Sequence, residues 1–401
     1  MTATLLAFIY SFQRSLLQPW RKIPLMDRWL LGELIGPLLF GVAAFTAVSL
    51  SVGAVFELVR RVAESGLPLD VAMQVLVLEM PSFLVLSFPM ATLMATLLTY
   101  SKLSGNSELT ALRSVGVATW RIVVPAVAIA MAMTLLTFTF NEAIVPRTRL
   151  DARNTLNRAI GRALSGEQKD NVMYSKYGEV SSSDGSSENG LTHFFYAQKY
   201  NKGIMEGVTL LDFSRKENQV LLNAKRAIWS EKNAEWEFFD GHILSVGQFA
   251  DKSTTSANFD RYIYNLSGSI GRGPMDVSRL PKDSEYMTIG QSRTAERLVR
   301  ESGDFKGARR LRVRIQEKFA FPAVCLVFGL IGSSLGVKPN SRRSRSQGFG
   351  ISVLLIFGYY LVAFVFSSLG VKGVLSPYFS AWLPVVIGIG GGVYLLRQAS
   401  R

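Results

Sequence analysis

Long apolar stretches alternate with shorter polar ones along the chain. Six stretches lack Asp, Glu, Lys and Arg, and these are residues 34–56, 80–101, 122–141, 319–337, 346–371 and 373–396. At about 1.5 Å per helical residue, each is long enough, or nearly so, to cross a hydrocarbon layer about 30 Å thick. Soluble cores do not usually produce six such stretches. The pattern therefore predicts a polytopic α-helical membrane protein with six transmembrane helices.

A different pattern fills residues 165–290, between the third and fourth apolar stretches. Gly and Ser clusters separate short runs such as HFFYAQKY and EWEFFDGHILSV. In the second run, one face at the two-residue period of a strand contains Trp236, Phe238, Leu244 and Val246. Short strands at roughly ten-residue spacing indicate an all-β sandwich or jelly roll. We therefore expect an all-β domain inserted between helices 3 and 4.

The predicted organisation has six parts, and the two connecting helices flank the β domain. In chain order they are an N-terminal segment (1–25), helices 1–3 (26–142), a connecting helix (143–164), the β domain (165–290), a second connecting helix (291–318) and helices 4–6 (319–401). The N-terminal segment has three interpretations: it lies on the membrane face, it is disordered, or it precedes an alternative start at Met26.

A short polar interruption, SKLSGNSELTALRSVGVATWR, separates the second and third apolar stretches. It predicts one small helix, residues 104–116, which Asn106 or Ser107 caps and Gly116 ends. Glu108 lies in the first turn and has no Lys or Arg three or four residues later, so its charge is unpaired within the helix. Such a helix either docks on a partner or is an ordinary solvated loop helix, and the local pattern leaves both open.

The basic residues set the predicted orientation, because Lys and Arg concentrate in cytoplasmic loops. The short loops on one side carry three, namely Arg60, Arg61 and Lys372. The segments on the other side carry thirteen, namely Arg14, Arg21, Lys22, Arg28, Lys102, Arg113, Arg121, Lys338, Arg342, Arg343, Arg345, Arg397 and Arg401. Both termini and the short helix are therefore expected in the cytoplasm. The net charge of +14 then needs no nucleic-acid partner to explain it.

The first connecting helix is basic and amphipathic. Arg147, Arg149 and Arg153 are spread around it, and an apolar side includes Leu156. Such a helix can meet anionic lipid headgroups at the outer membrane surface. A solvated helix leading into the β domain fits the same pattern.

The sequence lacks the motifs of common enzymes. It contains no G-x-x-x-x-G-K-[ST] or H-E-x-x-H, and a Ser within a span without a base partner is weak evidence for a protease, so we expect neither ATP hydrolysis nor protease chemistry from this chain. Cys325 is the single cysteine, and His193 and His242 lie about fifty residues apart without clustered acids. We therefore predict no metal and no cofactor. The inventory favours a transporter or scaffold over an enzyme.

Four segments resemble one known family. They are MDRWLLGELIGPLLFGV, MPSFLVLSFPMATLMATLLTYSKLSGNSELTALRSVGVATWRI, AKRAIWSEKNAEWEFFDGHI and FPAVCLVFGLIGSSLGVKPNSRRSRSQGFGISVLLIFGYY. In this order they resemble the LptF/LptG permeases of the lipopolysaccharide exporter, an ABC-type system of the Gram-negative inner membrane. The resemblance covers nearly the whole chain from Met26. It implies a multi-pass inner-membrane permease whose jelly roll lies in the periplasm.

The resemblance also implies partners and site residues. Two permeases pair, either as two copies or with a sister permease, and each inserts a coupling helix into a cytoplasmic ATPase dimer. The coupling residues would be Glu108, Leu109, Leu112 and Arg113. The first and fifth spans form lateral gates to a lipid cavity, here with Gly36, Gly41, Phe45, Phe357, Tyr360 and Phe364. The jelly roll, with Trp236, Phe238, Leu244 and Val246, would pass lipopolysaccharide to a periplasmic bridging protein.

The chain departs from the family pattern in two ways. Val385 follows Pro384, where the family often has Asn, and residues 34–56 lack the basic residues that some members use for lipid phosphates. Contact with phosphate headgroups would then fall to a partner, or to Arg147, Arg149 and Arg153. A rival interpretation is a membrane scaffold that relays ATPase strokes to a periplasmic partner and carries no lipid.

Overall fold

The computed structural model describes residues 24–65, 67–159, 169–181, 187–201, 204–216, 218–230, 235–247, 254–265, 286–337 and 345–400. The predicted N-terminal segment, through residue 23, and the end of the first connecting helix, beyond residue 159, lie outside these residues. The chain divides into a helical unit (1–60, 76–145 and 316–401) and a second unit (61–75 and 146–315) that contains the β domain.

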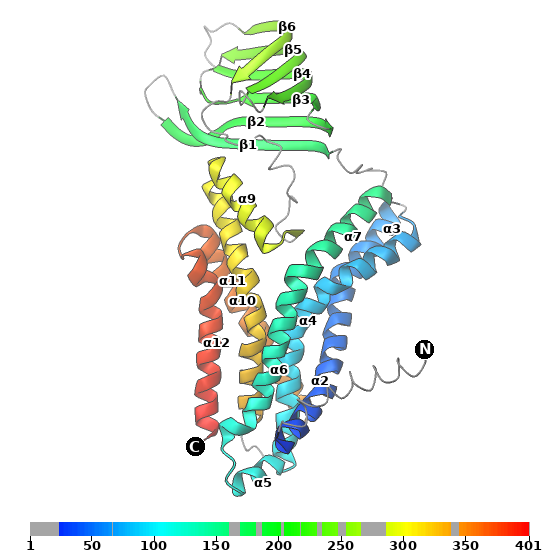
Figure 1. Cartoon of the computed structure of the whole chain (residues 1–401), viewed down its shortest axis with the longest axis vertical. Coiled ribbons are helices and arrows are strands. Elements are labelled where there is room, and N and C mark those ends of the chain that lie inside the picture. The colour runs from blue at the N-terminus through cyan, green and yellow to red at the C-terminus, as the bar shows by residue number, and fades with distance from the viewer. Residues whose placement is uncertain are drawn as a thin grey trace, which may run out of the picture. The chain divides into compact units, whose positions relative to one another are not determined.

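Six helices are long and apolar enough to cross a membrane, which confirms the six predicted spans (Figure 1). Their main segments are α2 (Leu25–Leu50), α4 (Leu69–Gly105), α6 (Thr119–Thr139), α10 (Phe305–Gly336), α11 (Arg345–Lys372) and α12 (Pro377–Ala399). The first continues through the π-helix η1 (Ser51–Val55) into α3 (Phe56–Ser65), and the third through η2 (Phe140–Ile144) into α7 (Val145–Ala159). The short helix α5 (Glu108–Ser114) joins the second span to the third.

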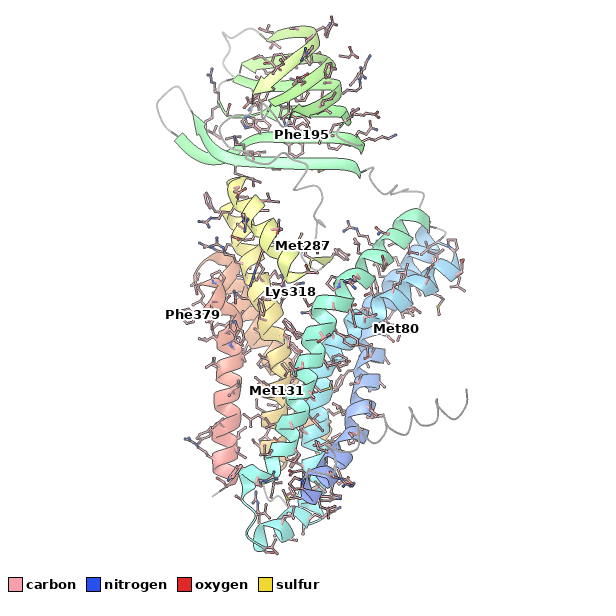
Figure 2. All side chains as sticks on the ribbon, in the orientation of Figure 1. Met80, Met131, Phe195, Met287, Lys318 and Phe379 are labelled. Atoms are coloured by element: carbon pink, nitrogen blue, oxygen red, sulfur yellow. The ribbon has the colours of Figure 1, made fainter. Side chains whose placement is uncertain are left out.

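The helical unit packs around α10. Its residues Val324, Val327 and Phe328 are at most 3% exposed in a cluster shared with α4, α11 and α12. Where α10 crosses α4, a Cβ on Gly332 would lie 2.2 Å from the Thr96 hydroxyl oxygen, so only glycine allows this approach. By contrast, large apolar side chains on the flanks of the unit are exposed, such as Phe379 on α12 at 57% (Figure 2). Lipid or partner helices cover such surfaces in a membrane.

The inserted domain is all-β, as predicted. Its described strands are β1 (Lys169–Ser181), β2 (Ser187–Asn201), β3 (Ile204–Asp212), β4 (Asn218–Ser230), β5 (Glu235–Gly247) and β6 (Thr255–Asn265). They form one antiparallel sheet in the order β1 to β6 (Figure 1). The prediction of short strands is wrong, because these strands contain 9 to 15 residues. The runs chosen from the sequence were the apolar middles of longer strands.

The sheet is strongly curled. Neighbouring strands lie about 4.8 Å apart, so β2 and β5 would be about 14 Å apart in a flat sheet. Instead, the ring centroids of Phe195 on β2 and Trp236 on β5 are 5.0 Å apart. Both side chains are at most 3% exposed, in a core that every strand from β2 to β6 contributes to. The curl therefore encloses a packed aromatic interior.

A crease crosses the six described strands of this sheet at one row. The pairing register is the same on both sides of this row, which consists of Asn171, Gln198, Gly207, Lys225, Asp240 and Asp260. Gly207 and Asp240 have φ values of 60° and 51°, in the left-handed region. On β3, Met205 and Val208 are both buried although they are three positions apart. Regular alternation would place residues three positions apart on opposite faces of the sheet. The residue in this row is thus skipped in the alternation. As a result, the inward-facing residues of β3 are odd-numbered before the row and even-numbered after it.

The helix after the β domain is α9 (Ile289–Glu301). It begins with a capping box, in which the Thr288 hydroxyl accepts a hydrogen bond from the Gln291 backbone and the Gln291 side chain bonds the Thr288 backbone. Its far end joins the β domain within the second unit, because the Tyr177 N–H donates to the Ser302 carbonyl at 2.7 Å.

Candidate functional site

The short helix α5 ends as predicted but does not begin as predicted. Gly116 has φ 89°, and its N–H bonds the Arg113 carbonyl at 2.9 Å while the Val117 N–H bonds the Leu112 carbonyl at 3.1 Å. This pair of bonds is a Schellman ending. The predicted side-chain cap is wrong, because Ser107 adopts φ 63° at the N-cap and its side chain bonds no amide there. A tight left-handed turn from α4 therefore replaces the cap.

One side of α5 faces the helical unit. Leu109 is 2% exposed, and Leu112 packs on the same cluster, which also holds Leu30 of α2, Tyr100 of α4 and Ile122 of α6. These two leucines therefore anchor α5 and do not present themselves to a partner. The outer side is formed by Thr110, Ala111, Ser114 and the C-cap Val115, all exposed, the last at 76%. This set is hereafter the α5 outer surface.

Glu108 and Arg113 lie in different surroundings. The Glu108 carboxylate is partly exposed and accepts a hydrogen bond from the Asn106 side chain at 2.9 Å, so it has a neutral partner. The Arg113 guanidinium points toward the bundle, where one nitrogen lies 3.4 Å from the Val337 carbonyl and 3.2 Å from the Ala399 carbonyl. Of the four predicted coupling residues, Glu108 alone is therefore placed at the edge of the α5 outer surface.

Two ion pairs that the sequence reasoning missed lie near α5. Arg121 bonds both Asp27 carboxylate oxygens, at 2.9 and 2.7 Å, and joins α6 to α2. Lys102 lies 2.8 Å from Glu33 and joins α4 to α2. A signal was present, since both pairs bring opposite charges together at the same predicted membrane face. The bidentate Arg121–Asp27 pair is the better buried of the two.

The six predicted gate residues do not form one surface. Three are open or exposed: Gly36, with no atom within 4 Å of an added Cβ, Phe357 at 70% and Phe364 at 72%. Three are packed inward: Gly41 against α4, and Phe45 and Tyr360 against the α10 cluster. The exposed members lie on α2 and α11, so these helices offer bare apolar faces. Their role as gates stays a prediction.

The four predicted groove residues do not share one face. Trp236 and Phe238 are 0% exposed in the domain core, and Ile243 packs on that core with them. Val246 is 40% exposed and Leu244 is partly exposed. The crease causes the difference, because it crosses β5 between Phe238 and Ile243. Before it, the even-numbered residues Trp236 and Phe238 face the core, and after it the odd-numbered Ile243 does. Strict alternation through EWEFFDGHILSV was therefore wrong.

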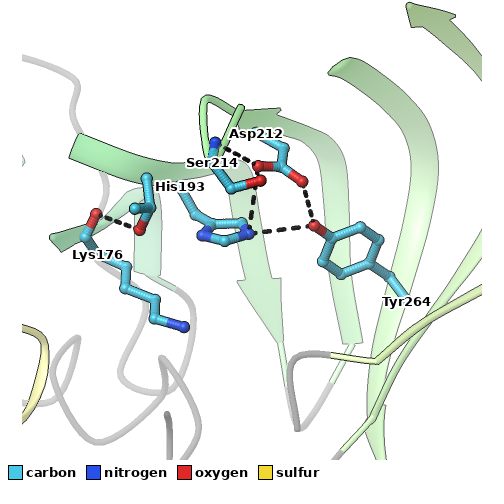
Figure 3. A network of polar contacts seen from close by, with 6 residues as sticks. Lys176, His193, Asp212, Ser214 and Tyr264 are labelled. Carbon is cyan, nitrogen blue, oxygen red and sulfur yellow. Dashed lines mark hydrogen bonds and ion pairs between the residues drawn. The ribbon is translucent and has the colours of Figure 1, made fainter. Parts of the chain in front are cut away.

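A polar cluster joins the two sides of the curled sheet (Figure 3). Tyr264 on β6 donates to Asp212 at the end of β3 at 2.7 Å, and its hydroxyl lies 3.1 Å from Nε2 of His193 on β2. The Ser214 backbone N–H also donates to Asp212, at 2.8 Å. In a flat sheet, β6 would be about 14 Å from β3. His193, Asp212, Ser214 and Tyr264, hereafter the seam cluster, therefore hold the curl closed by side chains.

The seam cluster perturbs its own titration. Burial lowers the pKa of His193, the Asp212 charge opposes this, and Lys176 adds to the lowering. Burial alone would raise the pKa of Asp212, but hydrogen bonds from Ser214 and Tyr264 outweigh it and lower that pKa. Since Tyr264 gives its proton to Asp212, neutral His193 donates from Nε2 to Tyr264. Its Nδ1 is then a buried acceptor without a partner among the described residues.

The three predicted headgroup residues differ in exposure. Arg147 is exposed, whereas Arg149 and Arg153 are partly buried. The Arg153 guanidinium lies 5.3 Å from the centre of the Tyr286 ring, so it makes a cation–π contact. Arg147 is the best placed of the three to meet a ligand.

The metal and cofactor predictions concern the two histidines. His193 belongs to the seam cluster, and His242 lies on β5 with its Nε2 3.4 Å from the Asn223 amide nitrogen. Across the part of the chain that the structure describes, no group of three or more His, Cys, Asp or Glu side chains is arranged to hold a metal ion.

Comparison with known proteins places the chain in a family. Residues 28–398 match the family model described as "Lipopolysaccharide export system permease LptF/LptG". A similar protein is the "Lipopolysaccharide export system permease protein LptG" of Haemophilus influenzae, 28% identical over 161 residues, or 40% of this chain and 41% of that relative. The aligned region thus spans less than half of the relative's length. Because the family match covers nearly the whole chain, this multi-pass membrane protein belongs to the LptF/LptG permease family.

Proposed function

We propose that the chain is a permease subunit of an exporter that extracts lipopolysaccharide, or a similar glycolipid, from the bacterial inner membrane. A separate cytoplasmic ATPase dimer drives it, and a second permease, either a copy or a sister chain, completes the membrane part. Both termini lie in the cytoplasm and the β domain in the periplasm. The chain needs no cofactor and hydrolyses no ATP itself.

The proposal rests chiefly on α5. A helix of seven residues between two spans would be loosely held as a solvated loop, but Leu109 and Leu112 anchor this one in the core of the helical unit. Its outer surface carries Val115, which is 76% exposed, and Trp120 in the first turn of α6 is also exposed, at 61%. An anchored helix with an exposed apolar surface beside a carboxylate is suited to dock on a partner and to carry force.

The β domain would accept lipid by opening. Exposing acyl chains to water costs about 0.8 kcal/mol per CH₂, so a lipid with several chains must stay covered throughout. Trp236 and Phe238 offer such cover, but both are sealed in the closed curl. Lipid would therefore reach them when the seam cluster separates and β6 moves away from β2 and β3.

The alternative is a relay that carries no lipid. The fully packed interior of the β domain favours it, since a force-transmitting domain needs a core and no groove. Such a relay would use α5 in the same way. The two proposals differ in whether lipid ever contacts the β-domain interior.

The first experiment is native mass spectrometry of the chain purified in mild detergent with its natural partners. Two permease masses, two ATPase masses and an adduct of glycolipid mass would support the exporter and identify the pairing. A complex with the ATPase that never carries glycolipid would favour the relay. A chain that co-purifies with no ATPase would contradict both.

A further inference from the structure

Arg113 connects α5 to the ends of two membrane helices. Val337 follows the last residue of α10, and Ala399 is the last residue of α12. The Arg113 guanidinium contacts the carbonyl oxygens of both, at 3.4 and 3.2 Å. The guanidinium is partly buried, and its Nε has no hydrogen-bond partner among the described residues. One side chain of α5 therefore reaches both helix ends.

The physical chemistry of helix ends suits this contact. The last carbonyls of a helix lack intrahelical partners and carry part of the negative end of the helix dipole. A guanidinium is permanently charged and presents several donors in a rigid plane, so it can bond two carbonyls at once. The Schellman ending of α5 fixes the backbone directly after Arg113. The contact therefore joins rigid elements.

The other polar contacts at this membrane face lead elsewhere. Arg121 and Lys102 bond Asp27 and Glu33, so they connect α6 and α4 to α2. Neither of these pairs involves α10 or α12. Among the side-chain hydrogen bonds of α5 in the described part of the chain, those of Arg113 alone reach the ends of α10 and α12. Leu109 and Leu112 pack on an apolar cluster that also includes Val337, Leu330 and Leu396, but such contacts are not directional. Arg113 is therefore the directional, polar link between α5 and these two helices.

We propose that Arg113 is a positioning residue that transmits movement of α5 to α10 and α12, and that it does not contact the ATPase. This inference rests on the proposed function. With Arg113 replaced, α5 still docks by its outer surface and the ATPase still turns over, but the polar link is lost and α10 and α12 follow the stroke less closely. Hydrolysis and lipid release then separate.

The test uses the chain reconstituted with its ATPase and a second permease in liposomes that contain lipopolysaccharide. Arg113→Gln removes the charge and the double contact, Arg113→Lys keeps the charge on a single ammonium, and Arg28→Gln is a control that removes a partly exposed cation at the same predicted face. Three quantities are measured: ATPase binding, ATP hydrolysis and lipopolysaccharide released per ATP. A fourth is hydrogen exchange at residues 333–337 and 396–400, with and without a non-hydrolysable ATP analogue.

For Arg113→Gln we expect unchanged ATPase binding and about tenfold less lipid released per ATP, an effect within the usual range of coupling between sites. Arg113→Lys should lose about threefold, and Arg28→Gln should match the wild type. The analogue should change exchange at both helix ends in the wild type but not in Arg113→Gln. Lost ATPase binding in Arg113→Gln, or a wild-type ratio in Arg113→Lys, would overturn the assignment.

The exchange readout separates this inference from the proposed function. A wild-type complex that responds to the analogue at both helix ends and releases no lipid would refute lipid export while keeping the Arg113 linkage. A complex that releases lipid, but whose exchange at the two helix ends does not depend on Arg113, would support lipid export and refute the Arg113 linkage.

Discussion

At the residue scale, the side chains that organise the molecule act over long sequence distances. Tyr264 reaches Asp212 and His193 across the curl of the sheet, and Arg113 reaches the ends of α10 and α12. Each of these contacts replaces water at a buried or partly buried polar atom. The cost of losing one partner is therefore the cost of an unsatisfied group, which is greater than the net value of the bond.

His193 should make the β domain less stable in mild acid. Its pKa is lowered below 6.5, so the folded domain favours the neutral ring, and stability falls as the pH drops through about 6.5. The pKa of Asp212 is lowered from 3.8, so its contribution changes only at more acidic pH. Hydrogen exchange of β2, β3 and β6 in the full chain, corrected for intrinsic rates, should rise between pH 7 and about 5.

The matched variants for this prediction are His193→Gln and His242→Gln. The first should flatten the pH dependence, and the second, on the exposed side of β5, should leave it unchanged. Equal pH dependence in all three chains would rule out His193 as its source.

Gly241→Ala should destabilise the β domain. An added Cβ would lie 2.2 Å from the Asn223 carbonyl oxygen and 3.0 Å from the Ala224 Cα, and neither backbone atom can move cheaply. We expect a loss of about 1–3 kcal/mol, typical of overpacking. Thermal unfolding in detergent measures it, with Gly178→Ala as the control, since its Cβ would meet Thr192 at an ordinary 3.4 Å. A smaller effect at Gly241 than at Gly178 would contradict the steric reason.

Local signals predicted some residues and misplaced others. Gly116 was predictable, because a glycine after a short helical pattern has a local cause. The break in the predicted face between Trp236 and Val246 was not predictable. The crease at Asp240 depends on the neighbouring strands and leaves no sign in the polar–apolar pattern of β5. The family resemblance, which implied a coupling role for Arg113, does not show which carbonyls lie opposite its side chain.

At the element scale, α5 has two sides with separate tasks. Its inner side holds Leu109, Leu112 and Arg113 against the helical unit, and its outer surface is free of such contacts. The sequence predicted the helix and its position between two spans. It could not assign the two sides, because both contain apolar residues.

Glu108→Lys should uncouple ATP hydrolysis from lipid movement while the chain still folds. The carboxylate is partly exposed at the edge of the outer surface, so reversal of its charge disturbs docking and leaves the core intact. Lipid release per ATP in reconstituted liposomes should fall by about tenfold or more. Glu108→Gln, which keeps the bond to Asn106 and loses the charge, should give a smaller loss. Normal transport by Glu108→Lys would refute the role.

At the scale of the whole molecule, the membrane made the fold predictable. Spanning segments must satisfy their backbone internally, so six uncharged stretches could hardly become anything but six helices. No such constraint acts on the β domain. Its strands could be located from the runs between Gly and Ser clusters, but their curl depends on contacts such as Phe195 with Trp236, which lie 41 positions apart in the sequence.

If the domain carries lipid, a probe in its interior should capture lipid during turnover. A photo-crosslinking amino acid at Phe238, which is 0% exposed, should form glycolipid adducts only when ATP is supplied. The same probe at Val246, which is 40% exposed on the same strand, serves as the control and should show no such dependence. Mass spectrometry of the adducts measures both. An interior probe that never captures lipid would favour the relay.

The ion pairs of α2 limit how this helix can move. Asp27 and Glu33 fasten its first third to α6 and α4, while the rest exposes Leu39, Phe40 and Val48 and ends in a π-helix. Any sideways displacement of α2 would therefore be a rotation about a fixed pivot near its N-terminal end. Over the roughly 26 Å from Glu33 to the end of α2, at about 1.5 Å per residue, a tilt of about 10° moves the far end by about 4 Å. An opening on α2 would thus be wedge-shaped, narrow at the N-terminal end of the helix and widest toward its C-terminal end.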